Sequence, residues 1–130
     1  MSGRYVLDPS AVSRFGESIL LGRLVASAHE VGSVLLLPVL AYAEALHAAA
    51  DEERYRILLG LRDRFAVTVL PAHAEDVEEL AGGMETAGSL GMAHAVLEAV
   101  RQGAVLVTAD RAAVQDELPD GWIFLDLRDG

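Results

Sequence analysis

The stretch Tyr5-Val6-Leu7-Asp8-Pro9 decides how this chain is expected to fold. A short apolar run is typical of a strand, and Asp followed by Pro favours a helix start, because Asp caps the first turn and Pro fits its first position. Two further apolar runs precede a helix-start residue, residues 34–37 before Pro38 and residues 104–109 before Asp110. Apolar runs without polar alternation are typical of parallel strands buried on both faces. The pattern therefore predicts an α/β fold with a mostly parallel central sheet and helices on both faces.

The remaining segments continue this alternation of strands and helices. We predict strands over residues 4–8, 34–37, 67–70, 104–108 and 122–127. We predict helices over residues 9–30 with a break near Gly16, and over residues 38–48, 51–64, 74–84, 89–102 and 111–118. Gly82-Gly83 and Gly88 are expected to mark the frayed end of the 74–84 helix, and Gly103 to end the 89–102 helix. Residues 128–130 are expected to form a loose tail.

Length and composition limit the classes of protein to consider. The 130 residues favour one domain over residues 1–130, and 52% hydrophobic with only 5% aromatic residues predicts a core of Ala, Val and Leu. The absence of cysteine excludes disulfides, thiolate metal sites and a cysteine nucleophile. All ten basic residues are arginine, so the chain lacks the lysine of a P-loop, a Schiff-base enzyme or a response-regulator receiver domain.

Hydropathy and charge bear on location and partners. No signal-peptide pattern precedes the first predicted strand, and no apolar run reaches the roughly 18 residues that suggest a membrane span. We therefore expect a cytoplasmic protein that does not enter a membrane. The formal net charge of −10 is unfavourable for unassisted binding to nucleic acid and suits a basic protein partner.

Three acidic residues stand where one site can use them. Asp8 and Asp110 each end an apolar run, and Glu44 lies inside the otherwise apolar segment 37–46. The carboxyl ends of parallel strands face the crevice in which open α/β sheets place their active sites. Converging carboxylates are suited to Mg²⁺ or Mn²⁺. We therefore expect these three side chains to converge on a metal site.

The order of the motifs resembles the PIN-domain family, which includes the VapC-type toxins of toxin–antitoxin pairs. The resemblance rests on residues 5–11, Pro38 with Glu44, residues 89–96 and residues 106–110, and it covers nearly the whole chain. It implies a metal-dependent endoribonuclease, often dimeric, whose acids hold Mg²⁺ or Mn²⁺ and activate water for in-line attack on a phosphodiester. It also implies that Ser10 assists near the metal and that Asp116 is a weaker, variable acid of the site.

Most of these residues also have an ordinary structural interpretation. Asp8 and Asp110 are suited to cap helices. Ser10 is suited to fill a first helical turn, and Asp116 to lie on a solvated helix face.

Glu44 is harder to explain as a structural residue. A carboxylate among small and apolar neighbours is costly unless a partner compensates its charge. That partner is either a metal or an arginine such as Arg14 or Arg23.

Ser89 departs from the family pattern, in which an Asp normally occupies this position. Serine caps a helix equally well but brings no negative charge to a metal, so we expect weak metal binding at a site with three acids instead of four. Glu85, four residues upstream, is an alternative source of the fourth carboxylate. His94 borders an apolar stripe and is expected to be partly buried or at an interface rather than to bind a metal.

We therefore predict a Mg²⁺- or Mn²⁺-dependent PIN-type endoribonuclease, the toxin of a toxin–antitoxin pair. Asp8, Glu44 and Asp110 are its expected catalytic metal ligands, and Ser10 and Ser89 its neutral contributors. The expected partners are an RNA substrate, a basic antitoxin-like protein and a second copy in a homodimer. The alternative is a catalytically degenerate PIN-fold protein-binding module, which the missing acid and the net charge favour. A purely structural subunit would leave Glu44 unexplained.

Overall fold

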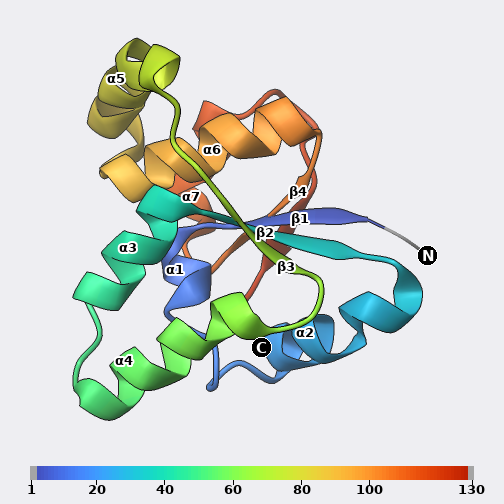
Figure 1. Ribbon diagram of the computed structural model, residues 1–130. Coiled ribbons are helices and arrows are strands. Elements are labelled where there is room, and N and C mark those ends of the chain that lie inside the picture. The colour runs from blue at the N-terminus through green and yellow to red at the C-terminus, as the bar shows by residue number, and fades with distance from the viewer. Residues whose placement is uncertain (1–2, 129–130) are drawn as a thin grey trace.

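The computed structural model describes residues 3–128 as a single five-stranded parallel sheet with helices around it (Figure 1). The strand order is β3-β2-β1-β4-β5, and every neighbouring pair is parallel. The strands are β1 (Arg4–Leu7), β2 (Val34–Pro38), β3 (Val67–Leu70), β4 (Val105–Thr108) and β5 (Phe124–Asp126). The α/β class and the parallel sheet expected from the apolar runs are confirmed.

Helices fill the connections between the strands. They are α1 (Pro9–Val12), α2 (Ile19–Val31), α3 (Val39–His47), α4 (Glu52–Leu59), α5 (Val77–Ala87), α6 (Leu90–Gln102) and α7 (Arg111–Val114). Three short 3₁₀ segments accompany them, η1 (Gly60–Asp63), η2 (Ala74–Asp76) and η3 (Gln115–Glu117). Every parallel connection therefore contains a helix, as a crossover between parallel strands requires.

The sheet is buried on both faces because successive strand residues point to opposite sides. On one side Val6, Leu36 and Leu106 pack with residues of α6 and α7. On the other side Leu7, Leu35 and Val107 belong to the same buried cluster as residues of α1, α2 and α3. Figure 1 shows α5 and α6 on one side of the sheet and α2 and α4 on the other. The two cores on either side of the sheet are mainly aliphatic, as the low aromatic content predicts.

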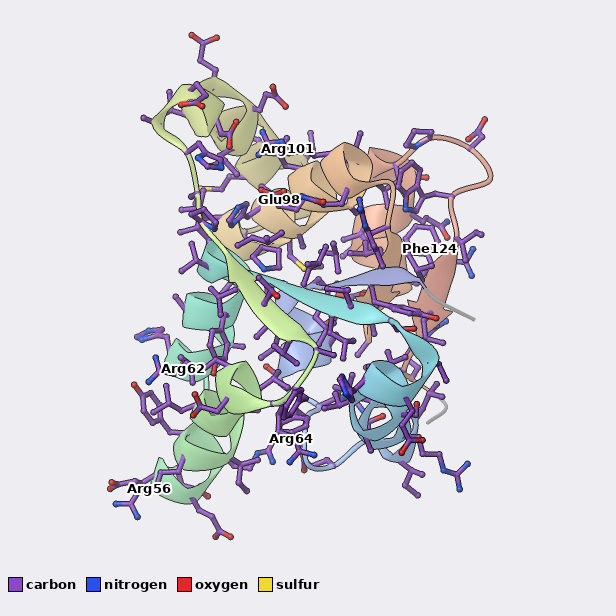
Figure 2. The ribbon with its side chains drawn as sticks, turned by 45° about the vertical axis from the view of Figure 1, so that its right-hand side comes forward. Arg56, Arg62, Arg64, Glu98, Arg101 and Phe124 are labelled. Carbon is purple, nitrogen blue, oxygen red and sulfur yellow. The ribbon has the colours of Figure 1, made fainter. Side chains whose placement is uncertain are left out.

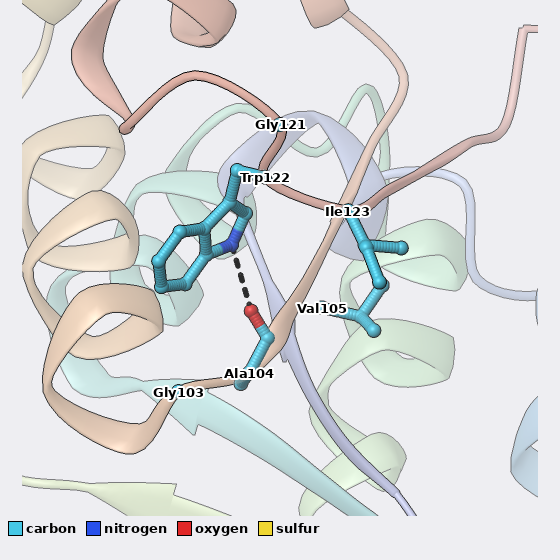
Figure 3. A pocket seen from close by; sticks show the side chains of 6 residues that line it. All are labelled: Gly103, Ala104, Val105, Gly121, Trp122 and Ile123. Atoms are coloured by element: carbon cyan, nitrogen blue, oxygen red, sulfur yellow. Dashed lines mark hydrogen bonds between the residues drawn. The ribbon is translucent and has the colours of Figure 1, made fainter.

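Element boundaries agree with the predictions in most places and differ in a few. The predicted 9–30 helix does break around Gly16, which has a φ of 90°, and α2 begins after Ser18. The predicted 51–64 helix changes to 3₁₀ geometry after Leu59. The predicted 122–127 strand is shorter, because Trp122 lies in the preceding turn, where its indole N–H donates to the Ala104 carbonyl over 2.9 Å (Figure 3).

Of the glycines expected to mark the end of α5, Gly88 does so, whereas the expected fraying at Gly82-Gly83 is wrong. The helix continues to Ala87 and ends at Gly88, which has a φ of 97°. Gly83 is needed inside it because a Cβ there would lie 2.9 Å from the Cβ of Ala93 in α6. Gly83 therefore allows close packing between α5 and α6, whereas a Cβ at Gly82 would meet nothing within 4 Å.

Two further expectations concern the ends and membrane contact. Arg128, predicted to be loose, pairs with Asp126 over 2.8 Å, while residues 129–130 lie outside the described part of the chain. Among residues 3–128, no helix has the length and apolar character needed to cross a membrane.

Candidate functional site

The candidate site lies where β1 and β4 end beside α3 and α6. A cavity of about 290 Å³ opens there, and it is lined by Pro9, Ser10, Ser13, Glu44, Ala45, Ala48, Met92 and Asp110. It contains two of the three predicted acids together with Ser10. The third acid, Asp8, directly precedes two of the lining residues and hydrogen-bonds to one of them.

Asp8 is completely buried at the junction of β1 and α1. Its backbone N–H donates to the Val107 carbonyl of β4, which holds it at the strand end. One carboxylate oxygen, Oδ1, accepts from the Ala11 N–H at 2.8 Å and from Ser10 Oγ at 2.6 Å. The other oxygen, Oδ2, is buried and has no hydrogen-bond partner among the described residues. The predicted capping role is thus confirmed, and it uses only one of the two oxygens.

Burial raises the pKa of Asp8 from 3.8 to about 6. Hydrogen bonds from Ser10 and the Ala11 backbone, together with the nearby Thr108 hydroxyl, oppose this increase, and the negative charge of Asp110 adds to it. A carboxylate with an unsatisfied buried oxygen and a neighbouring like charge favours either a proton or a cation. The capping role of Asp8 therefore does not account for its second oxygen.

Ser10 connects Asp8 to the end of β4. Its hydroxyl donates to Asp8, accepts from the Ala109 N–H at 2.8 Å, and lies 3.2 Å from the hydroxyl of Thr108. Thr108 in turn accepts from the Asp110 N–H at 2.9 Å. Ser10 is therefore part of a hydrogen-bond network that ties the two strand ends together, and it is more than a filler of the first helical turn.

Asp110 does not cap the helix that follows it. It stands at the N-cap position of α7, but its side chain makes no capping hydrogen bond. The residue is exposed and lines the cavity. The structural alternative proposed for this residue is therefore wrong, and its carboxylate remains available to the cavity.

Glu44 has partners, and among the described residues none of them is an arginine. Its Oε2 accepts from Ser89 Oγ at 2.9 Å, and its Oε1 accepts from the Gly91 N–H at 3.0 Å. Ser89 also caps α6 by accepting from the Met92 N–H. The carboxylate thus sits at the N-terminus of a 13-residue helix, where the helix dipole favours negative charge.

Gly91 is a site residue that the sequence predictions did not identify. A Cβ at this position would lie 2.8 Å from Glu44 Oε1, 2.8 Å from Pro9 Cγ and 3.0 Å from the Ala41 Cα. Only glycine lets α6 approach α3 and α1 closely enough for its backbone to bind Glu44. A glycine in the first turn of an otherwise good helix, two residues after its N-cap, was the available signal.

The predicted acids do not form a ready-made metal cluster. Glu44 and Asp110 line the same cavity and Asp8 adjoins it, but no three His, Cys, Asp or Glu side chains within residues 3–128 are close enough together to hold a metal. Asp116 and Glu85 are exposed, and neither lines the cavity. Carboxylate oxygens are the ligand type that hard cations prefer.

His94 is fully buried, so the expectation of a partly buried histidine is wrong. Its Nδ1 accepts from the Leu40 N–H, and its Nε2 lies 3.5 Å from Glu98. Burial lowers the pKa of His94, against the opposing influence of Glu98. Glu98 pairs with Arg101, which also binds Asp76 at 2.7 Å; Glu98 and Arg101 lie together on α6 in Figure 2. This network joins α6 to the segment before α5 and is separate from the cavity.

Comparisons with known proteins give a fold and no family assignment. No protein-family model and no curated protein matches the sequence. The chain is similar in structure to VapBC-1 from nontypeable Haemophilus influenzae (TM-score 0.61, 18% identity, 96% of this chain and 98% of that one). It is also similar to PAE2754 from Pyrobaculum aerophilum (0.61, 21%, 96% and 92%) and to VapBC2 from Rickettsia felis bound to a promoter DNA fragment (0.56, 15%, 95% and 98%). The PIN-like fold is thereby confirmed along nearly the whole chain.

Proposed function

We propose that this protein is a Mg²⁺- or Mn²⁺-dependent PIN-type endoribonuclease and the toxin of a toxin–antitoxin pair. The observation that carries the proposal is the unpaired, buried Oδ2 of Asp8 beside Asp110, at the edge of a cavity that also contains Glu44. An unsatisfied carboxylate oxygen is costly to a fold, and a functional role explains its presence. The structural similarity to the two VapBC structures supports the toxin assignment.

Asp8 and Asp110 are the residues that would hold the cation, because Mg²⁺ is commonly bound by one or two carboxylates and keeps several waters. When bound, the cation would supply an activated water and stabilise negative charge on the phosphate. Oδ2 of Asp8 is enclosed by protein, and Glu44 is already hydrogen-bonded, so we expect weak binding.

The other site residues position these carboxylates. Ser10 and the Ala11 N–H hold one oxygen of Asp8, which directs the other away from the helix end. Thr108 holds the backbone at Asp110. Glu44 is fixed on the opposite wall by Ser89 and Gly91, where its charge is available to water or to a cationic group.

The proposed partners follow from the same features. An RNA strand is the substrate, and a basic antitoxin-like protein is the inhibitor, with an arginine that enters the acidic cavity and engages Glu44. Two of the similar structures are VapBC-1 and VapBC2, which supports a protein partner. A homodimer is the proposed state of the free protein.

Cleavage of single-stranded RNA by the purified protein tests the enzyme proposal. Activity is expected with Mn²⁺ or Mg²⁺ and not with EDTA. Asp8→Asn and Asp110→Asn should lower the rate by at least about tenfold. Asp120→Asn, the same change at an exposed acid outside the cavity, should leave the rate unchanged. Cleavage in EDTA, or equal rates in all three variants, would contradict the proposal.

A degenerate binding module is the second candidate, and one observation favours it. Ser89 already satisfies Glu44 by a 2.9 Å hydrogen bond, so this wall of the cavity is stable without a cation. If no RNA is cleaved at any Mn²⁺ concentration while a partner still binds the cavity, the module is the better description. Binding lost in Glu44→Gln and retained in Glu30→Gln would place that partner in the cavity.

A further inference from the structure

His94 of α6 caps the first turn of α3, although it does not line the candidate cavity. Its side chain is fully buried, and its Nδ1 accepts a hydrogen bond from the Leu40 N–H at 3.3 Å. The N–H groups of a first helical turn lack partners within their own helix, and the N-cap residue Pro38 provides no side-chain acceptor. The imidazole therefore supplies an acceptor that α3 itself does not have.

The contact between His94 and Leu40 lies one helical turn from the contact that holds Glu44. Leu40 and Glu44 are four residues apart on α3, and His94 and Gly91 are three residues apart on α6, so both contacts lie along one line between the two helices. Gly91 donates its N–H to Glu44 Oε1 at 3.0 Å. Because Glu44 lines the candidate cavity, the distance between the helices at His94 bears on the shape of that cavity.

The other imidazole nitrogen, Nε2, faces charged groups that are not balanced. It lies 3.5 Å from Glu98 and has no hydrogen bond within residues 3–128. Glu98 and Asp76 are both buried, and in the described part of the chain Arg101 is the cation that pairs with both of them (Figure 2). The other groups that act on this cluster come from neighbouring elements and are the Pro71 backbone, His73 and Glu79. One negative charge thus remains that a proton on His94 would compensate.

The two nitrogens of His94 therefore have opposite requirements. Neutral imidazole can accept from Leu40 with Nδ1, whereas imidazolium has an N–H on both nitrogens and cannot accept a hydrogen bond. A proton would balance the charges of Glu98 and Asp76, but it would place Nδ1–H against the Leu40 N–H. Burial lowers the pKa of His94, against the opposing influence of Glu98, so the neutral form is favoured at neutral pH.

We propose that His94 is a positioning residue controlled by a proton: its neutral form holds α3 against α6, and its protonated form releases the first turn of α3. In the neutral form Glu44 stays bound to Ser89 and Gly91, and in the protonated form this wall of the cavity loosens. The proposal does not depend on nuclease activity, because it concerns how Glu44 is held and not what fills the cavity.

The sign of the pH dependence follows from the lowered pKa. Folding favours neutral His94, so its contribution to the free energy of unfolding is fully present above its ordinary pKa of 6.5 and is lost as the pH falls through the lower pKa of the folded protein. Asp8, whose pKa is raised, has the opposite dependence. A measurement on individual residues is therefore needed to separate the two groups.

Nuclear magnetic resonance of the full-length protein, labelled with ¹⁵N and titrated in EDTA from about pH 8 to about pH 5, provides that measurement. His94→Asn places an acceptor oxygen near the position of Nδ1 and does not titrate. Glu98→Gln removes one of the two buried carboxylates. His29→Asn is the control, because it removes an exposed histidine of α2.

In the wild type, the imidazole ¹⁵N shifts should report protonation of His94 as the pH falls. With the same midpoint, the protection factor of the Leu40 N–H should fall at least about fivefold and the Gly91 amide resonance should move. His94→Asn should abolish these responses, His29→Asn should keep them, and Glu98→Gln should move the midpoint to lower pH. A His94 imidazole still neutral at about pH 5, responses that persist in His94→Asn, or a midpoint unchanged by Glu98→Gln would overturn the proposal.

Discussion

Asp8 has one oxygen held by two donors and a second with none, and this asymmetry has a thermodynamic consequence. Its pKa is about 6 in the folded protein against an ordinary value of 3.8, so folding favours the protonated form. Its contribution to stability is fully present below about pH 3.8 and is lost as the pH rises through about 6. Above that pH, without a cation, the free energy of unfolding is lower by about 3 kcal/mol than it is below pH 3.8 on account of Asp8.

Asp8→Asn should therefore remove part of the pH dependence of stability. Asn keeps an acceptor for Ser10 and Ala11 but does not ionise, and the cost of its amide is the same at each pH. In EDTA, the free energy of unfolding of the wild type should fall by about 1 to 2 kcal/mol more than that of the variant between pH 5 and pH 8. Urea denaturation at the two pH values measures this loss, with Asp120→Asn as control. A pH-independent difference would show that Asp8 does not titrate in this range.

Ser89 is the second residue whose identity matters to the site. Ser89→Asp would place a carboxylate against Glu44 Oε2, which now accepts a hydrogen bond from Ser89 at 2.9 Å. Repulsion should lower the melting temperature in EDTA and tighten Mn²⁺ binding by about tenfold. Ser89→Asn is the matched control, because it caps a helix and remains neutral. Calorimetric titrations that coincide for the two variants would show that Ser89 is not beside the metal site.

At the scale of elements, the contact of α6 with α3 and α1 depends on Gly91. Gly91→Ala should destabilise the fold by about 1 to 3 kcal/mol, because its Cβ meets Pro9, Ala41 and Glu44 at 3.0 Å or less. Gly82→Ala in α5 is the control, since a Cβ there meets nothing within 4 Å. It should be neutral or stabilising by up to about 1 kcal/mol. Urea midpoints compare the two, and equal effects would contradict the close packing of α6.

The link between α6 and the start of α5 depends on Arg101. Arg101→Gln would leave Glu98 and Asp76, which are both buried, without their cation. Arg56→Gln breaks only an exposed pair with Glu52; Figure 2 shows Arg56 at the periphery and Arg101 between the helices. In thermal melts, the fall in melting temperature should be at least about three times as large for Arg101→Gln as for Arg56→Gln. Similar losses would indicate that the network adds little to stability.

At the scale of the whole molecule, the net charge of −10 should govern association. We expect a basic partner, such as the product of an adjacent small gene, to bind more weakly as salt rises from about 50 to about 300 mM, because screening removes long-range attraction. Glu44→Gln should weaken that binding, and Glu30→Gln should not. Pull-downs at both salt concentrations measure the effect. Equal recovery with both variants would place the partner outside the cavity.

The sequence by itself determined the strands, the helix starts and the α/β class. These features depend on local periodicity and on caps such as Asp8, Ser89 and Gly103, which act within a few residues of themselves. The placement of Asp8 and Asp110 at one edge of the sheet followed from the rule for strand ends, whereas Glu44 was singled out as a carboxylate inside an apolar helical segment. The incorrect prediction of fraying at Gly82-Gly83 shows the limit of local patterns. A glycine that breaks a helix and one that packs against another helix look alike in sequence.

Only the tertiary structure decided which partners the acids have. The two oxygens of Glu44 are held by Ser89 and by the backbone of Gly91, 45 and 47 residues away, and this depends on how closely two helices pack. Packing between distant segments likewise leaves one oxygen of Asp8 unpaired, keeps the Asp110 side chain from capping α7, and buries His94 fully. Burial and hydrogen-bond satisfaction are properties of three-dimensional surroundings, so no local pattern encodes them.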